Sequence, residues 1–302
     1  GSTSVICTDK TGTLTQNKMT VVDYYLPKGT KEQFPNDPTT WSDSESALVH
    51  IAVLCNDSHI NEEGKELGDP TETALINFSN KVNKNYNEIR ECFPREAEIP
   101  FDSDRKLMTT IHTFNKQKTM LVKGGPDVMF ERCSFVYMDG KKQPLTKEIL
   151  ERFQEANEEF SKNALRVLAY GYKEIAAEKA NIGLEDEHEL VLVGLTAMID
   201  PPREEVYSSI EEAKKAGIRT VMITGDHKTT AQAIGQDIGL MEKDDIAVTG
   251  QELDAMSDEE LDQKLEHISV YARVSPENKI RIVRAWQRKG KITSMTGDGV
   301  ND

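Results

Sequence analysis

The sequence predicts an α/β fold: a parallel sheet flanked by helices, with a second α/β domain inserted after the first strand. Three short segments rich in Val, Ile, Met and Thr support the parallel sheet. They occupy residues 4–9, 219–226 and 291–298, and each ends in Asp, as expected for buried strands that lead into turns. Helical patterns lie between the later two, and this alternation predicts parallel strands with right-handed crossovers.

The helices beside this sheet are predicted from apolar spacing and from end signals. Apolar residues recur at helical spacing in residues 203–216 and 229–238, and Gly217 ends the first of these helices. Pro276 begins a third helix, because the N–H that proline lacks is not needed in the first turn. We expect these helices to cover the parallel sheet.

The inserted domain is assigned to residues 21–199, between the two sheet-forming segments at 1–20 and 200–302. Its strand-like segments lie at 107–114, 119–123 and 191–195, and its helix-like segments at 46–54, 71–82 and 147–165. The mixture predicts an α/β domain.

Three further segments have a predicted structural role. Asp200-Pro201-Pro202-Arg203 marks the return from the insert, where two prolines stiffen the chain. This segment fits either a hinge between domains or an ordinary turn before a helix. Residues 29–43 are expected to form a surface loop, and the acidic residues 254–260 a solvated helix face.

Composition restricts the class of protein. The chain has 302 residues, enough for about two domains, and a formal net charge of -15, which argues against nucleic-acid binding. The four cysteines form no C-x-x-C pair and are expected to be free thiols. The longest apolar run, at 191–199, is too short to cross a membrane. Together with its abrupt ends, this suggests a monomeric fragment excised from a larger protein.

Acidic and hydroxyl side chains follow each of the three predicted strands. The strand ends carry Asp9, then Thr224 with Asp226, then Asp298 with Asp302. Ligands of an open parallel sheet bind beyond these carboxyl ends, where converging carboxylates repel one another unless a cation lies between them. Mg²⁺ prefers such hard oxygen ligands beside phosphate.

Further residues extend this pattern toward phosphate chemistry. Lys279 would add positive charge at the start of a helix, and glycines at positions 12, 225, 297 and 299 would let backbone N–H groups approach phosphate oxygens. An Asp nucleophile, a metal ion, a lysine and amide donors together indicate phosphoryl transfer.

The motif from Asp9 to Thr15, Asp-Lys-Thr-Gly-Thr-Leu-Thr, resembles the phosphorylation signature of the P-type ATPases. The phosphorylation domain of that family is a Rossmann-like member of the haloacid dehalogenase superfamily. Further family motifs are matched in the expected order by Thr224-Gly225-Asp226, Asp200-Pro-Pro-Arg203, Arg273 with Lys279, and Thr296-Gly-Asp-Gly-Val-Asn-Asp302. The resemblance covers the whole chain.

This resemblance implies a role for each matched residue around the phosphorylated side chain. Asp9 would be the nucleophile, and Asp9, the backbone carbonyl of Thr11 and Asp298 would hold Mg²⁺. Thr224 and Lys279 would bind the transferred phosphate.

Four other matched residues complete the implied set. Asn301 and Asp302 would orient the site. Asp226 and Arg273 would lie near the nucleotide or the domain interface.

The resemblance also implies that the inserted domain binds ATP. Family members stack an aromatic ring on adenine and place a lysine deep in the pocket, and Phe101 and Lys123 match these positions. Ser103 stands where many calcium pumps carry arginine, so no phosphate-steering arginine is expected there. The other implied pocket residues are Glu72, Lys106, Gly124 and Arg166.

Thr11 separates the main interpretation from its alternatives. Related phosphatases carry a second Asp at this position as general acid and base, and without it water should attack the aspartyl phosphate slowly. The intermediate would then survive until a conformational change. This argues against a soluble phosphatase with a large cap domain. Asp9, Lys279 and Asp298 argue against a nucleotide-binding module without catalysis for the parent protein. That alternative stays open for the fragment itself, which stops at Asp302 before the later strands expected of the phosphorylation domain.

We therefore interpret the chain as a catalytic fragment of an ATP-driven cation pump, located at the cytoplasmic face of a membrane. Its partners would be ATP and the membrane helices and actuator domain of the same parent chain. The short insert and the motif Asp69-Pro-Thr-Glu72 are most similar to calcium pumps. A sodium/potassium or proton pump is the alternative.

Overall fold

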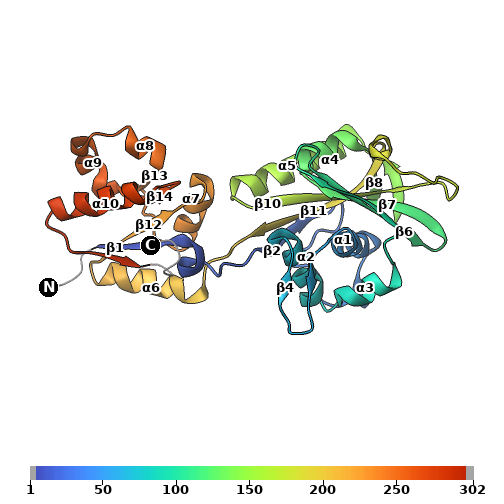
Figure 1. Cartoon of the computed structure of the whole chain (residues 1–302), viewed down its shortest axis with the longest axis horizontal. Coiled ribbons are helices and arrows are strands. Elements are labelled where there is room, and N and C mark those ends of the chain that lie inside the picture. The colour runs from blue at the N-terminus through green and yellow to red at the C-terminus, as the bar shows by residue number, and fades with distance from the viewer. Residues whose placement is uncertain (1–4, 297–302) are drawn as a thin grey trace. The chain divides into compact units, whose positions relative to one another are not determined.

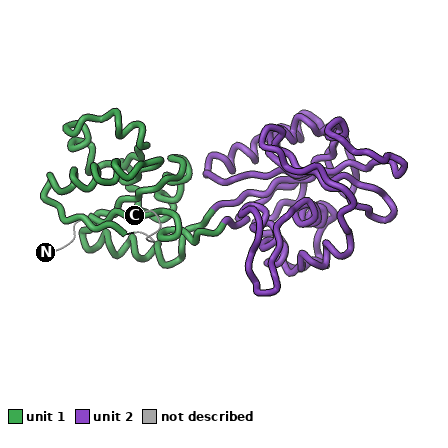
Figure 2. The backbone as a smooth tube through the Cα atoms, in the orientation of Figure 1, with its two compact units in different colours: residues 1–18, 200–302 green, residues 19–199 purple. Residues whose placement is uncertain are grey.

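The computed structural model describes residues 5–296, and the chain divides into two compact units (Figure 2). The first unit comprises residues 1–18 and 200–302, and the second comprises residues 19–199. Five of the residues that the sequence analysis placed at the first site lie outside the described residues: Gly297, Asp298, Gly299, Asn301 and Asp302.

The first unit contains a five-stranded parallel sheet in the order β13-β14-β12-β1-β15. This order confirms the predicted α/β fold with a parallel sheet. The strands are β1 (Val5–Asp9), β12 (Arg219–Thr224), β13 (Ile246–Thr249), β14 (Ile268–Ala272) and β15 (Thr293–Thr296). The helices are α6 (Glu204–Lys215), α7 (Lys228–Asp237), α8 (Gly250–Asp254), α9 (Asp258–Lys264) and α10 (Pro276–Arg288).

Helices cover both faces of this sheet, as Figure 1 shows for α6 and α10. A buried apolar cluster joins one face of the strands to α8, α9 and α10 through Leu253, Leu261 and Trp286. Cys7 of β1 belongs to the same cluster, and burial raises the pKa of its thiol to about 12. With β1 fixed between β12 and β15, the position of Asp9 at its end is well defined.

The second unit contains a larger and mostly antiparallel sheet in the order β5-β6-β7-β10-β11-β8-β9, with β2 also paired to β11. Only the β11–β8 pair in this sheet is parallel among the described residues. The strands of this sheet are β2 (Thr20–Tyr25), β5 (Ala97–Asp102), β6 (Leu107–Phe114), β7 (Gln117–Gly124), β8 (Cys133–Met138), β9 (Lys141–Pro144), β10 (Arg166–Glu174) and β11 (Leu190–Ile199). A short hairpin is formed by β3 (His59–Ile60) and β4 (Glu66–Leu67).

Helices cover both faces of this sheet (Figure 1), and each face packs into its own buried apolar core. The helices on one face are α1 (Asp43–Leu54), α2 (Pro70–Lys81) and α3 (Tyr86–Cys92), and those on the other are α4 (Pro126–Arg132) and α5 (Lys147–Lys162). Neighbouring residues of β6 contribute to different cores, Leu107 to the α4–α5 core and Met108 to the α1–α3 core. This alternation follows from the pleat of the strand.

Two sequence predictions differ from the structure in detail. The helix predicted at 147–165 ends at Lys162, because Ala164 adopts a left-handed φ of 63°. The acidic residues 254–260 do not form one helix face, because α8 ends at Asp254 and Ser257 caps a new helix by accepting a hydrogen bond from Glu260 N–H.

Other features agree with the sequence. The four cysteines are free. No helix among the described residues has the length and apolar character required to cross a bilayer.

Candidate functional site

The first candidate site lies at the carboxyl ends of β1 and β12. Asp9 ends β1 and pairs with Ile223, so Thr224 follows directly on the neighbouring strand. Lys279, in the first turns of α10, has its Nζ 3.9 Å from Asp9 Oδ1. A cavity of about 380 Å³ is lined by Asp9, Lys10, Thr11, Thr224, Gly225, Asp226, Val274, Pro276 and Lys279.

Asp226 forms an ion pair that the sequence did not predict. Lys10 Nζ lies 2.6 Å from Asp226 Oδ2, and the lysine side chain is only 2% exposed. The Thr11 hydroxyl donates weakly to the same oxygen at 3.4 Å. Asp226 therefore holds the start of the loop after β1, a contact within the first unit.

Asp200 and Arg203 also hold the loop that follows β1. The Arg203 guanidinium donates to the carbonyls of Gly12 at 2.7 Å and Thr15 at 3.1 Å. Asp200 accepts from the Thr15 hydroxyl at 2.6 Å and from Lys18 N–H at 3.0 Å. Gly12 allows the chain to turn here, because its φ of 80° favours glycine. Sequence reasoning missed these contacts, although charged residues flanking two prolines were visible.

Arg273 is not among the residues that line this cavity. Its Nη2 lies 2.8 Å from Nε2 of the His227 ring, and its own φ is 56°. The Arg273 backbone packs so closely on Gly250 that a Cβ at position 250 would lie 2.3 Å from the Arg273 carbonyl oxygen.

The structure describes two of the three residues that the resemblance implies as Mg²⁺ ligands. Asp9 and Thr11 line the cavity and supply a carboxylate and a carbonyl, which are hard oxygen ligands of the kind Mg²⁺ prefers. Asp298 lies outside the described residues. Within 5–296, no group of three His, Cys, Asp or Glu side chains could hold a metal ion.

The second candidate site is a cavity of about 510 Å³ in the second unit. It brings together all six residues that the sequence analysis placed in a nucleotide pocket, although they come from five separate segments. The lining residues are Asp57, Asp69, Thr71, Glu72, Phe101, Lys106, Met108, Lys123, Gly124, Gly125, Arg166, Val167 and Leu168.

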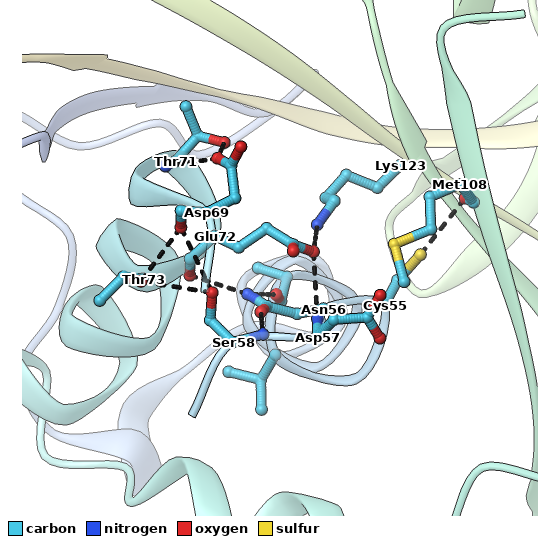
Figure 3. A network of polar contacts seen from close by, with 12 residues as sticks. Cys55, Asn56, Asp57, Ser58, Asp69, Thr71, Glu72, Thr73, Met108 and Lys123 are labelled. Carbon is cyan, nitrogen blue, oxygen red and sulfur yellow. Dashed lines mark hydrogen bonds and ion pairs between the residues drawn. The ribbon is translucent and has the colours of Figure 1, made fainter. Parts of the chain in front are cut away.

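Figure 3 shows a polar network that includes several of these lining residues. Lys123 Nζ lies 2.7 Å from Glu72 Oε2, and the same oxygen accepts a hydrogen bond from Asp57 N–H at 3.1 Å. Asn56 donates to the carbonyl of Glu72 at 2.9 Å. Glu72 thus links the first turn of α2, the end of α1 and the end of β7.

Asp69 caps the start of α2. Its carboxylate accepts from Thr71 N–H at 2.9 Å, which satisfies a donor that the first turn of a helix leaves open. Burial opposes its ionisation, but hydrogen bonds from Thr71 and the positive charge of Arg166 hold its pKa below the usual value. The cap fixes Glu72, three residues further along.

Phe101 and Lys106 lie on opposite ends of the turn between β5 and β6. The Phe101 ring is 60% exposed, which leaves its face available to a flat ligand. Gly124 must lack a side chain, because a Cβ there would lie 2.2 Å from the Lys106 carbonyl oxygen. The glycine therefore lets the turn pack directly on the end of β7.

Cys55 is buried, and its thiol donates to the carbonyl of the lining residue Met108 at 3.3 Å. Burial raises the pKa of this thiol to about 11. It is therefore protonated at neutral pH and is no nucleophile there.

The protein of the α/β class thus carries two candidate sites. One lies at strand ends and has an Asp, a Thr and a Lys, and the other is a separate pocket with an exposed aromatic ring and cationic side chains. A model of the family described as "P-type ATPase, cytoplasmic domain N" matches residues 45–205. The chain belongs to this P-type ATPase family.

Individual relatives match the entire chain. It is 77% identical to a calcium-transporting ATPase of Listeria monocytogenes and 63% identical to calcium-transporting ATPase 1 of Lactococcus lactis. It is also 36% identical to the sodium/potassium-transporting ATPase subunit alpha-1 of Oreochromis mossambicus. The chain spans 34% of the length of each of the first two relatives and 35% of the third.

Proposed function

We propose that this chain is the catalytic headpiece of an ATP-driven cation pump that is phosphorylated on Asp9. The observation that carries the proposal is the approach of the Lys279 ammonium to the Asp9 carboxylate at the end of a parallel strand, beside Thr224. Asp9 would be held in position while a positive charge and a hydroxyl face the space where a phosphoryl group would arrive.

In the proposed reaction an Asp9 carboxylate oxygen attacks the γ-phosphorus of ATP. The bond from that phosphorus to the β,γ-bridging oxygen breaks, and ADP leaves with the electron pair. Thr224 and Lys279 would stabilise the charge on the transferred phosphoryl oxygens. Bound Mg²⁺ would neutralise phosphate charge, held by Asp9, the Thr11 carbonyl and Asp298.

Thr11 supports an intermediate that persists. Its hydroxyl is not a base, and it is directed toward Asp226 Oδ2. The acidic Asp226 is itself paired with Lys10, so it is poorly placed to activate water. The aspartyl phosphate would therefore be hydrolysed slowly unless another residue supplied a base.

ATP would bind in the second unit, in the cavity lined by Phe101, Lys106, Lys123 and Arg166. The exposed Phe101 ring offers a surface for the adenine base, and the cationic side chains offer charge to the phosphates. The remaining partners would be membrane helices and an actuator domain of the parent, with this headpiece at the cytoplasmic face of the membrane.

Calcium is the proposed cargo. The two relatives at 77% and 63% identity are named for calcium transport, whereas the relative named for sodium and potassium is 36% identical. A sodium/potassium pump is the second candidate.

The test is acid-quenched labelling of the full-length parent with γ-labelled ATP. We expect a hydroxylamine-sensitive label that is absent in Asp9→Asn and retained in Asp262→Asn, a control at an exposed surface ion pair with Arg288. Label that survives in Asp9→Asn would reject the assignment of Asp9 as the nucleophile. Label that requires Na⁺ rather than Ca²⁺ would reject calcium as the cargo.

A further inference from the structure

The turn between β5 and β6 is flanked by two residues of the candidate nucleotide pocket, Phe101 and Lys106. Residues 103–106 join β5 to β6, and Lys106 has a left-handed φ of 62°. Its N–H donates to the Asp102 carbonyl at 2.6 Å. Phe101, at the other end of the turn, is 60% exposed. The Lys106 carbonyl is also held from β7 by the Gly125 N–H, and further contacts hold the backbone beside Phe101.

Arg105 supplies such contacts next to Phe101. Its Nη1 donates to the Pro100 carbonyl at 3.1 Å, and its Nη2 makes a longer contact with the Ile99 carbonyl at 3.5 Å. These two residues directly precede Phe101. The arginine therefore ties its own turn to the backbone that sets the direction of the aromatic ring.

The Arg105 guanidinium is in turn held by a fully buried carboxylate. Arg105 Nε lies 2.8 Å from Glu187 Oε1, with the two side chains 10% and 0% exposed. This contact is electrostatic and not a well-aligned hydrogen bond. Glu187 also accepts a short hydrogen bond from the Thr109 hydroxyl, and its backbone carbonyl accepts from Arg132 at 3.1 Å.

The ion pair lies on the face of the sheet opposite to the pocket. Thr109 alternates along β6 with Met108, which lines the pocket, and shares its face with Leu107 and Ile111 of the α4–α5 core. Neither Arg105 nor Glu187 is among the residues that line the cavity. A direct contact with nucleotide is therefore not their role.

We propose that Arg105 and Glu187 are positioning residues for the nucleotide pocket. The pair fixes Phe101 and Lys106 in the orientation that ATP requires, so that the pocket is formed before the ligand arrives. The effect extends to the end of β7, because Gly125 N–H donates to the Lys106 carbonyl at 3.1 Å. This inference rests on the proposed ATP site.

The experiment uses the 302-residue chain and compares Arg105→Lys, Glu187→Gln and the double variant Arg105→Met/Glu187→Leu. Amide hydrogen exchange at Lys106 and Gly125 is measured without nucleotide, together with the ATP dissociation constant and the unfolding midpoint. We expect exchange and the dissociation constant to rise by roughly tenfold in all three variants, the loss that corresponds to one weakened contact.

The double variant separates positioning from stability. Glu187→Gln leaves the Arg105 charge without its carboxylate partner, Arg105→Lys keeps the charge but loses the guanidinium contacts, and the double variant removes both charges. The unfolding midpoint of the double variant should recover above that of Glu187→Gln, while exchange and ATP affinity should not recover. ATP affinity that recovers with the midpoint would show a purely structural pair and overturn the proposal.

Glu45→Gln provides the matched control. Glu45 is also a buried carboxylate in this unit, paired with Lys31 at 3.1 Å and absent from the cavity lining. It should lower the unfolding midpoint without changing exchange at Lys106 and Gly125.

Unchanged exchange in Arg105→Lys and Glu187→Gln would overturn the positioning role, whatever the ATP data show. Failure of the ATP site itself has a different signature: Phe101→Ala would leave the ATP dissociation constant unchanged, while the exchange measurements would still decide the role of the pair.

Discussion

The two units place their candidate sites on different parts of a sheet. In the first unit, Asp9 and Thr224 meet because parallel neighbours β1 and β12 end at the same edge. In the second unit, the cavity is lined across antiparallel neighbours, with Met108 on β6, Lys123 on β7 and Leu168 on β10.

This difference teaches how each site is supported. A parallel sheet gathers its strand ends by topology alone, so the first site depends on the loop that follows β1. An antiparallel sheet mixes both kinds of strand end at every edge, so topology defines no site there. The second site must be built from specific side-chain contacts such as the Glu72–Lys123 pair.

The largest effect is expected where the first unit depends on its loop. Arg203→Ala removes two guanidinium hydrogen bonds from the carbonyls of Gly12 and Thr15. Because hydrogen bonds to charged groups contribute about 1.5–3 kcal/mol each, the first unit should lose roughly 3–6 kcal/mol in urea unfolding. Hydrogen exchange should rise at the Gln16 amide and stay unchanged in β7. An equal rise in exchange in both units would contradict the claim that Arg203 supports the first unit alone.

The next effect tests the side-chain character of the second site. Phe101→Ala should weaken ATP binding by about 1–3 kcal/mol, the range for aromatic stacking on a base, measured by titration. Lys123→Ala should weaken binding in the same direction. The matched control is Val22→Ala, which removes a similarly exposed apolar side chain from β2 outside the cavity. Equal affinity for the Phe101 variant and the parent would move the ATP site elsewhere.

A smaller effect should follow from removing one helix cap. Asp69→Ala should lower the free energy of unfolding by about 1 kcal/mol and also weaken ATP binding, because the cap fixes the turn of α2 that carries Glu72. Asp37→Ala removes the cap of the short helix Pro38–Thr40, outside the cavity. It should affect stability alone, and a loss of ATP affinity in that variant would contradict the argument.

The smallest effect concerns pH. Burial lowers the pKa of His50 and of His112 in the second unit, while the unfolded chain keeps values near 6.5. The unfolded state then binds more protons, so stability falls as pH drops through about 6.5 and levels off below the folded pKa values. Urea unfolding between pH 8 and 5 should show this decline, and His50→Gln/His112→Gln should reduce it. An identical pH profile in both proteins would refute the assignment.

The sequence predicted where the first site lies better than it predicted the contacts that hold its loop in place. Buried strands that end in Asp or Thr indicate where side chains converge, and this follows from topology. The pairs Lys10–Asp226 and Arg203–Thr15 join residues far apart in the chain, and no periodicity specifies which charge meets which partner. Arg105 and Glu187, 82 residues apart, were missed for the same reason.

The prediction of the second site came from the family resemblance and not from residue patterns. Taken singly, Phe101 resembles a core aromatic residue and Lys123-Gly124 resembles a turn, because their exposure and neighbours are set by the β5–β6 hairpin and by β10. Helix ends were predicted less well than helix cores, since a single left-handed residue such as Ala164 decides where α5 stops.

The two passages of the chain between the units run beside each other. Thr20 pairs with Ile199 in the second unit, and Thr15 bridges Pro202 in the first. The inserted residues 19–199 therefore begin and end at neighbouring points, so closing either unit on itself would need only a short connection and little loop entropy. Residues 19–199 could be produced as a self-contained module, and a few glycines could replace them between Lys18 and Asp200.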